Sequence, residues 1–146
     1  MDIRPATVDD LASIERLLLQ CDLPIIGVSD HLHNFVVATD GSTMCGCGGV
    51  EHYGEAALLR SIAVAGPVRG SGLGQTIISR LITGCRAMSV RSMVLLTTTA
   101  EGYFERHGFE RVARDQVPAS VLESTQFQGI CPNSATAMLK ELTSEP

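Results

Sequence analysis

A glycine-rich turn joins an apolar segment to an amphipathic one, with the sequence Val68-Arg69-Gly70-Ser71-Gly72-Leu73-Gly74-Gln75. Residues 57–64 before it are almost continuously apolar, as in a strand covered on both faces, and apolar residues recur at helical spacing over 72–88. The first N–H groups of a helix lack partners within it, and glycines let an anion approach them closely. The turn therefore predicts a strand, a phosphate-binding loop and a helix, with Arg69 adding a cation.

Spacing distinguishes three kinds of phosphate site at this turn. A P-loop needs a lysine followed by serine or threonine, and the chain has no such pair. A dinucleotide-binding fingerprint needs G-x-G-x-x-G, and here the third glycine is misplaced. The remaining pattern, R-x-x-G-x-G at Arg69, Gly72 and Gly74, resembles the acyl-CoA pyrophosphate loop of the GNAT N-acetyltransferase superfamily. The alternative is a plain glycine-rich turn between a strand and a helix.

A second block supports the same resemblance. A β-rich run over 93–99 follows the helix, and a short helix then carries Tyr103-Phe104-Glu105-Arg106-His107-Gly108-Phe109. This Y-F-x-x-x-G-F ending resembles the last conserved block of the superfamily. The resemblance implies the α/β (α+β) GNAT fold. That fold is a mixed, mostly antiparallel sheet flanked by helices, in which the central parallel strands 57–64 and 93–99 splay to admit acetyl-CoA.

Size and composition limit the remaining possibilities. The 146 residues fit one domain, 1–146, and a net charge of −5 argues against a nucleic-acid partner. No apolar segment approaches the roughly 20 residues of a membrane span, and the N-terminus lacks a signal-peptide apolar region, so we expect a cytoplasmic protein with no membrane partner. Cys45 and Cys47 face one side of a strand, which suits a soft metal or metalloid, but we expect ordinary core thiols and no metal site.

The rest of the chain shows signals for further elements. Thr7 is placed to cap a helix that runs to about Gln20, and the Asp40-Gly41 pair predicts a hairpin turn. The helix over 72–88 should bury Leu73, Ile77, Leu81, Cys85 and Met88. The other expected elements are strands at 2–4, 34–39, 43–53, 110–114 and 135–142, and short helices at 29–33 and 118–124.

The resemblance implies which residues contact the coenzyme. Backbone groups of Ile62, Ala63 and Val64 would face the pantetheine arm and the acetyl oxygen. We also expect contacts from Thr99 and Phe104. The loop residues expected to hold the diphosphate are Arg69, Gly70, Ser71, Gly72, Leu73, Gly74 and Gln75.

Acetyl transfer to an amine needs an acid for the departing sulfur and a base for the amine. The superfamily often places a tyrosine where this chain has Phe104, and Tyr103 stands one residue earlier, a rotation of about 100° on a helix. Either Tyr103 or water is the acid, and a phenol with a pKa near ~10 suits that task. The candidate bases are Glu51, His52 and Glu101, acting through water, and each of them also fits a plain surface or strand-edge position.

Arg60 interrupts the apolar strand before the loop, so its guanidinium needs an anionic partner. That partner is either the carboxylate of the substrate or an internal Asp or Glu. We expect Arg60, Thr97, His33 and Phe127 to line the acceptor site, although the two histidines near it, His31 and His33, fit an exposed loop equally well.

Three segments resemble the small GNAT proteins encoded in arsenic-resistance operons, and the first two also resemble the acetyltransferase domain of N-acetylglutamate synthases. These segments are 59–64, 95–100 and 127–135. The resemblance implies direct transfer from acetyl-CoA, in a ternary complex, to the α-amino group of a small amino acid or glutamate analogue, including an arsenic-containing one. Many relatives of this size are homodimers. The alternatives are a CoA-binding sensor of thiols or arsenite, and an acetyltransferase of peptide or protein N-termini.

Overall fold

The computed structural model describes residues 1–130 and 134–142. Its seven strands form one mixed sheet in the order β1-β2-β3-β4-β5-β7-β6, and β4 and β5 run parallel. The strands are β1 (Asp2–Pro5), β2 (Phe35–Asp40), β3 (Thr43–Tyr53), β4 (Ala56–Val64), β5 (Ser92–Thr97), β6 (Glu110–Arg111) and β7 (Thr136–Glu141). The predicted mixed sheet with a parallel pair is confirmed.

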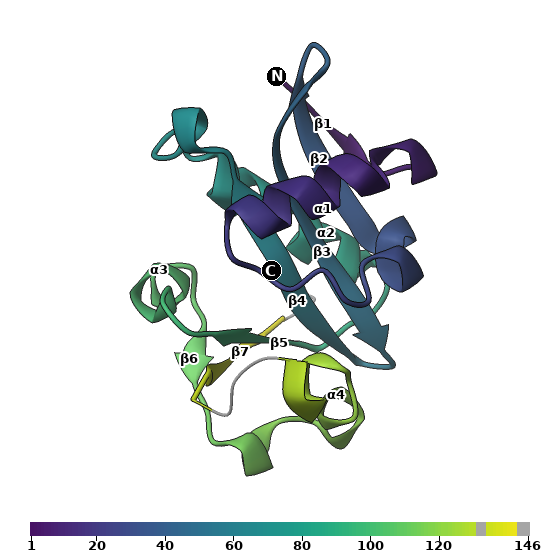
Figure 1. The fold of residues 1–146 in the computed structure, drawn as a ribbon. Coiled ribbons are helices and arrows are strands. Elements are labelled where there is room, and N and C mark those ends of the chain that lie inside the picture. The colour runs from purple at the N-terminus through teal and green to yellow at the C-terminus, as the bar shows by residue number, and fades with distance from the viewer. Residues whose placement is uncertain (131–133, 143–146) are drawn as a thin grey trace. The chain divides into compact units, whose positions relative to one another are not determined.

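Four α-helices and several short helices connect the strands of the described residues (Figure 1). The α-helices are α1 (Leu11–Gln20), α2 (Leu73–Ala87), α3 (Glu101–Glu105) and α4 (Ala119–Leu122). The 3-10 helices are η1 (Val8–Asp10), η2 (Ser29–Asn34), η3 (Gly66–Val68) and η4 (Arg114–Gln116), and a π-helical turn, η5, spans Gln126–Ile130.

The chain groups into two compact units. The first comprises Met1–Glu51 and Arg60–Thr83, and the second comprises His52–Leu59 and Gly84–Pro146. The parallel register of β4 with β5 joins Ala56–Leu58 to Ser92–Val94, inside the second unit. The predicted single domain and the predicted splay of this strand pair stay predictions.

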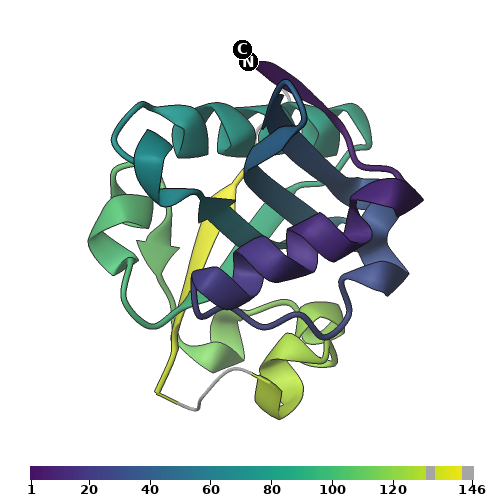
Figure 2. The ribbon, with the colours of Figure 1, turned by 45° about the horizontal axis from the view of Figure 1, so that its top comes forward.

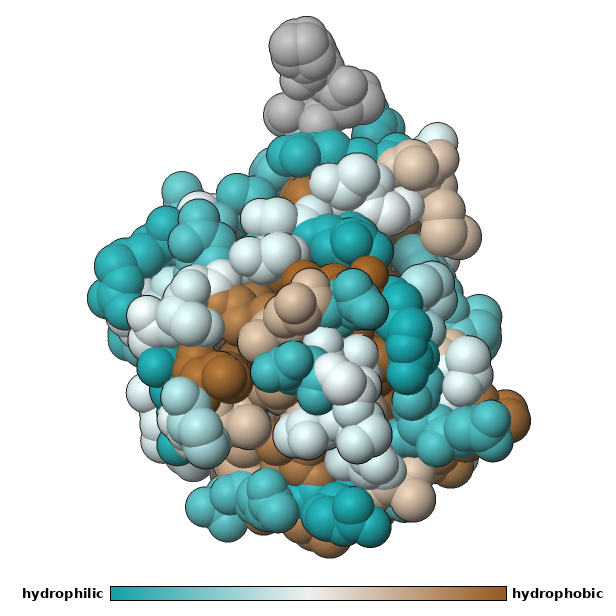
Figure 3. Space-filling view, turned by 90° about the horizontal axis from the view of Figure 1, so that it is seen from above, coloured by the Kyte–Doolittle hydropathy of each residue, from teal (hydrophilic) through white to brown (hydrophobic). Residues whose placement is uncertain are grey.

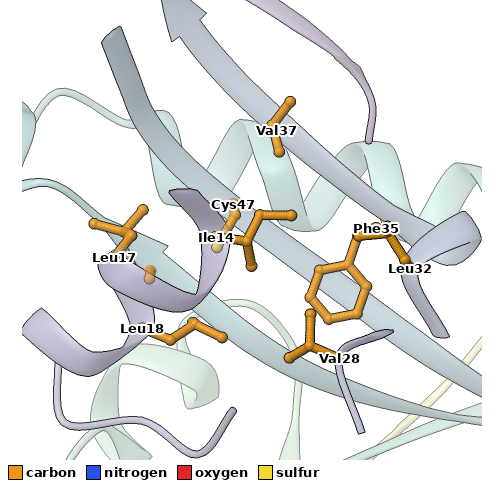
Figure 4. Close-up of a cluster of buried hydrophobic side chains, with 9 residues drawn as sticks. Ile14, Leu17, Leu18, Val28, Leu32, Phe35, Val37 and Cys47 are labelled. Carbon is orange, nitrogen blue, oxygen red and sulfur yellow. The ribbon is translucent and has the colours of Figure 1, made fainter. Parts of the chain in front are cut away.

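In the first unit, α1 and α2 cover opposite faces of the strands (Figure 2). On one face, Ile14, Leu17 and Leu18 of α1 pack against Phe35 and Cys47 (Figure 4). These three residues lie on one face of α1, because residues three or four apart share a helix face.

On the other face of these strands, α2 lies close to the backbone of β3. A Cβ atom added to Gly48 would lie 2.6 Å from Cδ1 of Ile62 and 2.7 Å from Cγ2 of Ile77. Gly46 faces Leu73 and Ile77 in the same way. The absence of side chains at Gly46 and Gly48 therefore allows this close approach. The bulge of this hairpin lies in β3 at Cys45, because Ala38 pairs with Gly46 whereas the next residue, Thr39, pairs with Met44.

A capping arrangement begins the first helix. The backbone N–H of Thr7 donates to Oδ2 of Asp10 at 2.7 Å, and the guanidinium of Arg4 donates to both carboxylate oxygens at 2.8 and 2.9 Å. The hydrogen bonds from Arg4, followed by the N–H of Thr7, lower the pKa of Asp10 to about 2. Thr7 therefore stands at the predicted cap, and the helix starts with the 3-10 turn η1.

In the second unit, β7 pairs with both β5 and β6. Its buried cluster consists of Ala56, Leu58, Val94, Val117, Val121 and Ala137. The strand predicted over 110–114 is wrong beyond Arg111. The N–H of Val112 still donates to the carbonyl of Ala137, but the N–H of Ala113 donates to the side chain of Gln116 and begins the turn η4.

Two predicted element ends also need correction. The helix α2 ends at Ala87, and Ser89 takes a positive φ of 64°, so Met88 is 61% exposed and does not continue the buried stripe. The strand β5 ends at Thr97 and does not reach Thr99. The hydroxyl of Thr97 accepts the N–H of Ala100 at 3.0 Å, which turns the chain away from the sheet.

The surface mixes polar and apolar side chains. On the face in Figure 3, hydrophobic residues reach the surface in small areas separated by hydrophilic ones. Within the described residues, no helix combines the length and the apolar character needed to cross a membrane.

Candidate functional site

The glycine-rich loop lies wholly in the first unit, between the end of β4 and the start of α2. Gly70 and Gly72 have positive φ values of 84° and 87°, a conformation that favours glycine. The N–H of Ser71 donates to the carbonyl of Val68. The other backbone amides of the loop donate no hydrogen bond to any described residue. They are those of Gly70, Gly72, Leu73, Gly74 and Gln75. A helix start with this many free donors is suited to bind an anion.

The space around these amides is open. A Cβ atom added to Gly70 or Gly72 would have nothing within 4 Å. The Arg69 side chain is exposed, and its Nε donates to the carbonyl of Val64 at 3.1 Å while Nη2 lies 3.5 Å from Sγ of Cys21. These contacts hold a guanidinium beside the free amides. The residues therefore fit a diphosphate, and their contact with one stays a prediction.

β4 bends just before the loop. Ser61 has a φ of 63°, which is uncommon for a residue with a side chain, in the middle of an otherwise extended strand. Ile62 and Val64 after the bend are partly exposed, and Ala63 is buried. Sequence reasoning assigned backbone roles to these three residues but missed Ser61, because a serine in an apolar strand gives no signal of a left-handed conformation.

Arg60 and Glu51 form a buried ion pair in the first unit. Nη1 of Arg60 donates to Oε2 of Glu51 at 2.7 Å, and the two side chains are 3% and 2% exposed. Arg60 also donates through Nε to the hydroxyl of Ser61 at 2.9 Å and through Nη2 to the carbonyl of Pro24 at 3.3 Å. The internal ion pair that the sequence left open for Arg60 is therefore present. Its contact with an acceptor carboxylate stays a prediction.

The histidines of the first unit lie on η2. Nε2 of His31 lies 3.6 Å from Oε1 of Glu51, and the His31 side chain is 28% exposed. His33 is exposed, and its Nε2 lies 3.3 Å from Nδ2 of the Asn34 side-chain amide. The sequence did not connect His31 with Glu51, because residues 20 apart in the chain give no pairing signal.

His52, Glu101 and Tyr103 belong to the second unit. His52 is half-buried on β3, and strand alternation turns it away from the face that Glu51 occupies. Glu101 begins α3 and binds the guanidinium of Arg111 in an exposed ion pair at 2.6 Å. Of the three predicted bases, Glu51 and His52 therefore occupy opposite faces of β3, and the role of each base stays a prediction.

Tyr103 lies on α3 between two rings. Its ring centroid is 5.2 Å from that of Phe104 and 4.6 Å from that of His107, both in edge-on geometry. Burial raises the pKa of the Tyr103 phenol, so the hydroxyl keeps its proton at neutral pH. Burial, with the cations of Arg106 and Lys140, lowers the pKa of His107, so the neutral form of this imidazole is favoured.

The remaining predicted contacts also lie in the second unit. Phe104 is buried against Phe109 with ring centroids 5.9 Å apart, whereas Thr99 is exposed. Phe127 lies in the π-helical turn, where its ring packs under the guanidinium of Arg114 at 5.3 Å. Cys131 to Asn133 of the third resembling segment lie outside the described residues.

The cysteines of the described residues are free thiols. Cys45 and Cys47 are buried, and desolvation raises the pKa of Cys47 to about 12. No group of three or more His, Cys, Asp or Glu side chains in the described part of the chain is arranged to hold a metal ion.

The chain is similar to several characterised protein groups. A model of the acetyltransferase (GNAT) domain matches residues 31–111. An amino-acid acetyltransferase of Ralstonia nicotianae is 25% identical over 80% of this chain and 28% of its own length. An amino-acid acetyltransferase of Mycobacterium tuberculosis is 24% identical over 83% of this chain and 75% of its own length.

The fold is similar to that of N-acetylglutamate synthase from Neisseria gonorrhoeae, solved with coenzyme A and N-acetyl-glutamate. The TM-score is 0.84 at 17% identity, over 97% of this chain and 35% of the synthase. The chain thus spans about a third of the length of the Ralstonia and Neisseria proteins. Since the domain model matches more than half of its residues, the chain belongs to the GNAT acetyltransferase family.

Proposed function

We propose that the chain is an acetyl-CoA-dependent N-acetyltransferase whose acceptor is the α-amino group of a small amino acid or glutamate-like analogue. The observation that carries this proposal is the loop of free amides at Gly70, Gly72 and Leu73 beside the guanidinium of Arg69. Amides and a guanidinium that need no rearrangement bind a diphosphate with little loss of conformational entropy.

Each part of the proposed site has a separate task. Bound acetyl-CoA supplies the acetyl group. The amides of the loop and Arg69 hold the diphosphate, and the backbone of residues 62–64 orients the pantetheine arm. Tyr103 or water protonates the departing sulfur, and the raised pKa of Tyr103 keeps the phenol in the protonated form that this task requires. Transfer is direct, within a ternary complex.

The proposed acceptor class follows from the relatives. Those from Ralstonia and Mycobacterium are amino-acid acetyltransferases, and this chain shares its fold with N-acetylglutamate synthase. His33, Thr97 and Phe127 are the proposed acceptor contacts besides Arg60. An arsenic-containing amino acid belongs to the proposed acceptor class, since an ionised arsinic group carries a negative charge on two oxygens, as a side-chain carboxylate does.

The test is an acceptor screen that measures CoA release from acetyl-CoA. The panel contains glutamate, glutamine, their N-acetyl derivatives, which lack a nucleophilic amine, and phosphinic and arsinic analogues of glutamate. We expect turnover with at least one primary α-amine and none with its N-acetylated form. Tight CoA binding without turnover would instead indicate a CoA-binding sensor, and turnover only with peptides would indicate acetylation of N-termini.

We also propose that the protein works in the cytoplasm as a homodimer, on a small-molecule amine and not on nucleic acid. Sedimentation velocity measures the oligomeric state. A single species at about twice the 15.5 kDa chain mass supports the dimer, and a monomer across the concentration range contradicts it.

A further inference from the structure

Three charged or titratable side chains of the first unit contact one another in series, from the interior to the surface. Arg60 and Glu51 are buried and joined at 2.7 Å, and His31 lies 3.6 Å from the second oxygen of Glu51 with 28% of its side chain exposed. The three residues come from β4, β3 and η2. Ser61 extends this series at its buried end, because its hydroxyl accepts a hydrogen bond from Nε of Arg60 at the bend of β4.

Glu51 is poorly placed to take a proton from an acceptor. Its side chain is 2% exposed, and its Oε2 accepts a short hydrogen bond from Arg60. An ion pair of this kind holds a carboxylate in place when further hydrogen bonds satisfy the partner. Arg60 has those bonds, to Ser61 and to the carbonyl of Pro24. The Glu51 carboxylate is therefore held in a fixed position beside the imidazole, within an ion pair that has no net charge.

The His31 imidazole has one nitrogen toward this fixed carboxylate. A carboxylate beside Nε2 favours the tautomer in which Nε2 carries the proton, and this leaves the lone pair on Nδ1. Nδ1 has no hydrogen-bond partner among the described residues. The 3.6 Å separation is longer than a hydrogen bond, and such contacts often tighten once substrate is bound.

The packing around the ion pair also fixes the segment that carries His31. Gly27 has a φ of 88°, and a Cβ atom there would lie 2.9 Å from Nη1 of Arg60 and 3.7 Å from Oε2 of Glu51. The N–H of His31 donates to the carbonyls of Gly27 and Val28. The imidazole is thus on a turn that is held directly against the ion pair.

We propose that His31 is the general base of the reaction, with Glu51 and Arg60 as positioning residues. The proposal rests on the proposed acetyltransferase function. His31 removes a proton from the ammonium form of the acceptor, so that the neutral amine can form its bond to the acetyl carbon, and it passes this proton to solvent. The amine loses a second proton when the new bond forms. That proton replaces the one that Tyr103 or water gives to the sulfur as the carbon–sulfur bond breaks.

The primary test compares His31→Ala with the wild type. We expect kcat to fall by about 10²-fold or more, the usual contribution of a general base. The Kd of CoA, measured by calorimetry, should stay unchanged. Added imidazole should restore part of the kcat of His31→Ala and leave the wild type unaffected, since a free imidazole can fill the space of the lost ring. The control is Ser29→Ala, an exposed position on the same 3-10 helix, which should keep the wild-type kcat.

Glu51 is tested by Glu51→Gln, which keeps the shape of the side chain and removes its charge. A positioning role predicts a lower kcat with little change in the acceptor KM or in CoA binding. Because the change weakens a buried ion pair, urea unfolding is measured in parallel to confirm that the variant is folded under the assay conditions.

The outcomes separate the two proposals. A wild-type protein that acetylates no amine in the screen overturns the proposed function and the role of His31 together. A wild type that turns over, with an equally active His31→Ala, overturns the role of His31 alone. A His31→Ala variant that is slow but unaffected by imidazole also overturns it, because the ring would then act only through packing.

Discussion

Arg69 is a side chain whose task can be tested separately from the loop backbone. Its guanidinium is held by the carbonyl of Val64 and the sulfur of Cys21 and makes no ion pair with a described residue. Arg69→Gln should therefore weaken CoA binding about tenfold, or by about 1.4 kcal/mol, because it removes a charged hydrogen bond to the diphosphate. Isothermal titration calorimetry with CoA measures the change.

The matched control for this prediction is Arg80→Gln. Arg80 is exposed on α2, seven residues after its first residue, and loses the same charge. Equal weakening in both variants would mean that Arg69 acts through the net charge of the protein and does not contact the diphosphate.

The reactivity of the Cys47 thiol tests the alternative that the protein is a sensor of thiols or arsenite. It is 0% exposed, and burial raises its pKa to about 12, so the reactive thiolate is scarce at neutral pH. We expect that a thiol reagent at pH 8 modifies the partly exposed Cys21 well before Cys47, as peptide mass spectrometry would show. Fast modification of Cys47 in the folded protein would revive a thiol or arsenite sensor.

At the scale of elements, the contact between α2 and β3 depends on the absence of a side chain at Gly48. Gly48→Ala should destabilise the protein by about 1–3 kcal/mol, because its Cβ would overlap Ile62 and Ile77. Gly84→Ala is the matched change in open space on α2 and should stabilise by about 0.5–1 kcal/mol. Urea unfolding measures both, and equal effects would contradict the close approach.

The start of the first helix predicts a dependence of stability on pH. The pKa of Asp10 is lowered from 3.8 to about 2, chiefly by the hydrogen bonds of Arg4. The folded state therefore favours the ionised form, and this stabilisation is complete above about pH 4 and is lost as the pH falls toward 2.

Asp10→Asn isolates this contribution. Its stability deficit relative to the wild type, measured by urea unfolding, should be constant above pH 5 and should shrink toward pH 2. A deficit that does not change over this range would show that the Arg4–Asp10 contact is unimportant for folding.

Some elements could be predicted because their signals are local. The first helix, the hairpin at Asp40-Gly41 and the loop before α2 depend on periodicity, turn residues and caps that lie within a few residues of each other. The extent of β6 could not be predicted, because the side chain of Gln116 takes the N–H of Ala113 and ends the strand. The β-strand propensity of residues 110–114 does not show that the Gln116 side chain competes with a neighbouring strand for this N–H.

At the scale of the whole molecule, the family predicted from the sequence is confirmed, and the diphosphate role of the loop stays a prediction. The arrangement of the acid and base groups was not predicted. The loop is one continuous segment, so the spacing of its arginine and glycines along the sequence was enough to identify it. His31, Glu51 and Arg60 are brought together only by the register of β3 and β4 and by the turn at Gly27. Sequence reasoning therefore gave Glu51 and Arg60 separate tasks, where the structure pairs them.

The net charge of −5 is a property of the whole chain and does not describe the local charge at the loop. Averaged over the chain, it disfavours an anionic ligand, yet the free amides and Arg69 form a locally positive site. Binding of CoA should therefore weaken only moderately as salt is raised, because short contacts in the loop are screened less than long-range attraction.

The most direct test of the account is a calorimetric comparison of CoA with pantetheine, which lacks the diphosphate and the nucleotide, and with ADP, which keeps a diphosphate. The account predicts saturable binding of CoA, weaker binding of ADP and little or no binding of pantetheine at the same concentrations. Absence of CoA binding, or pantetheine binding as tight as that of CoA, would contradict the assignment of the loop.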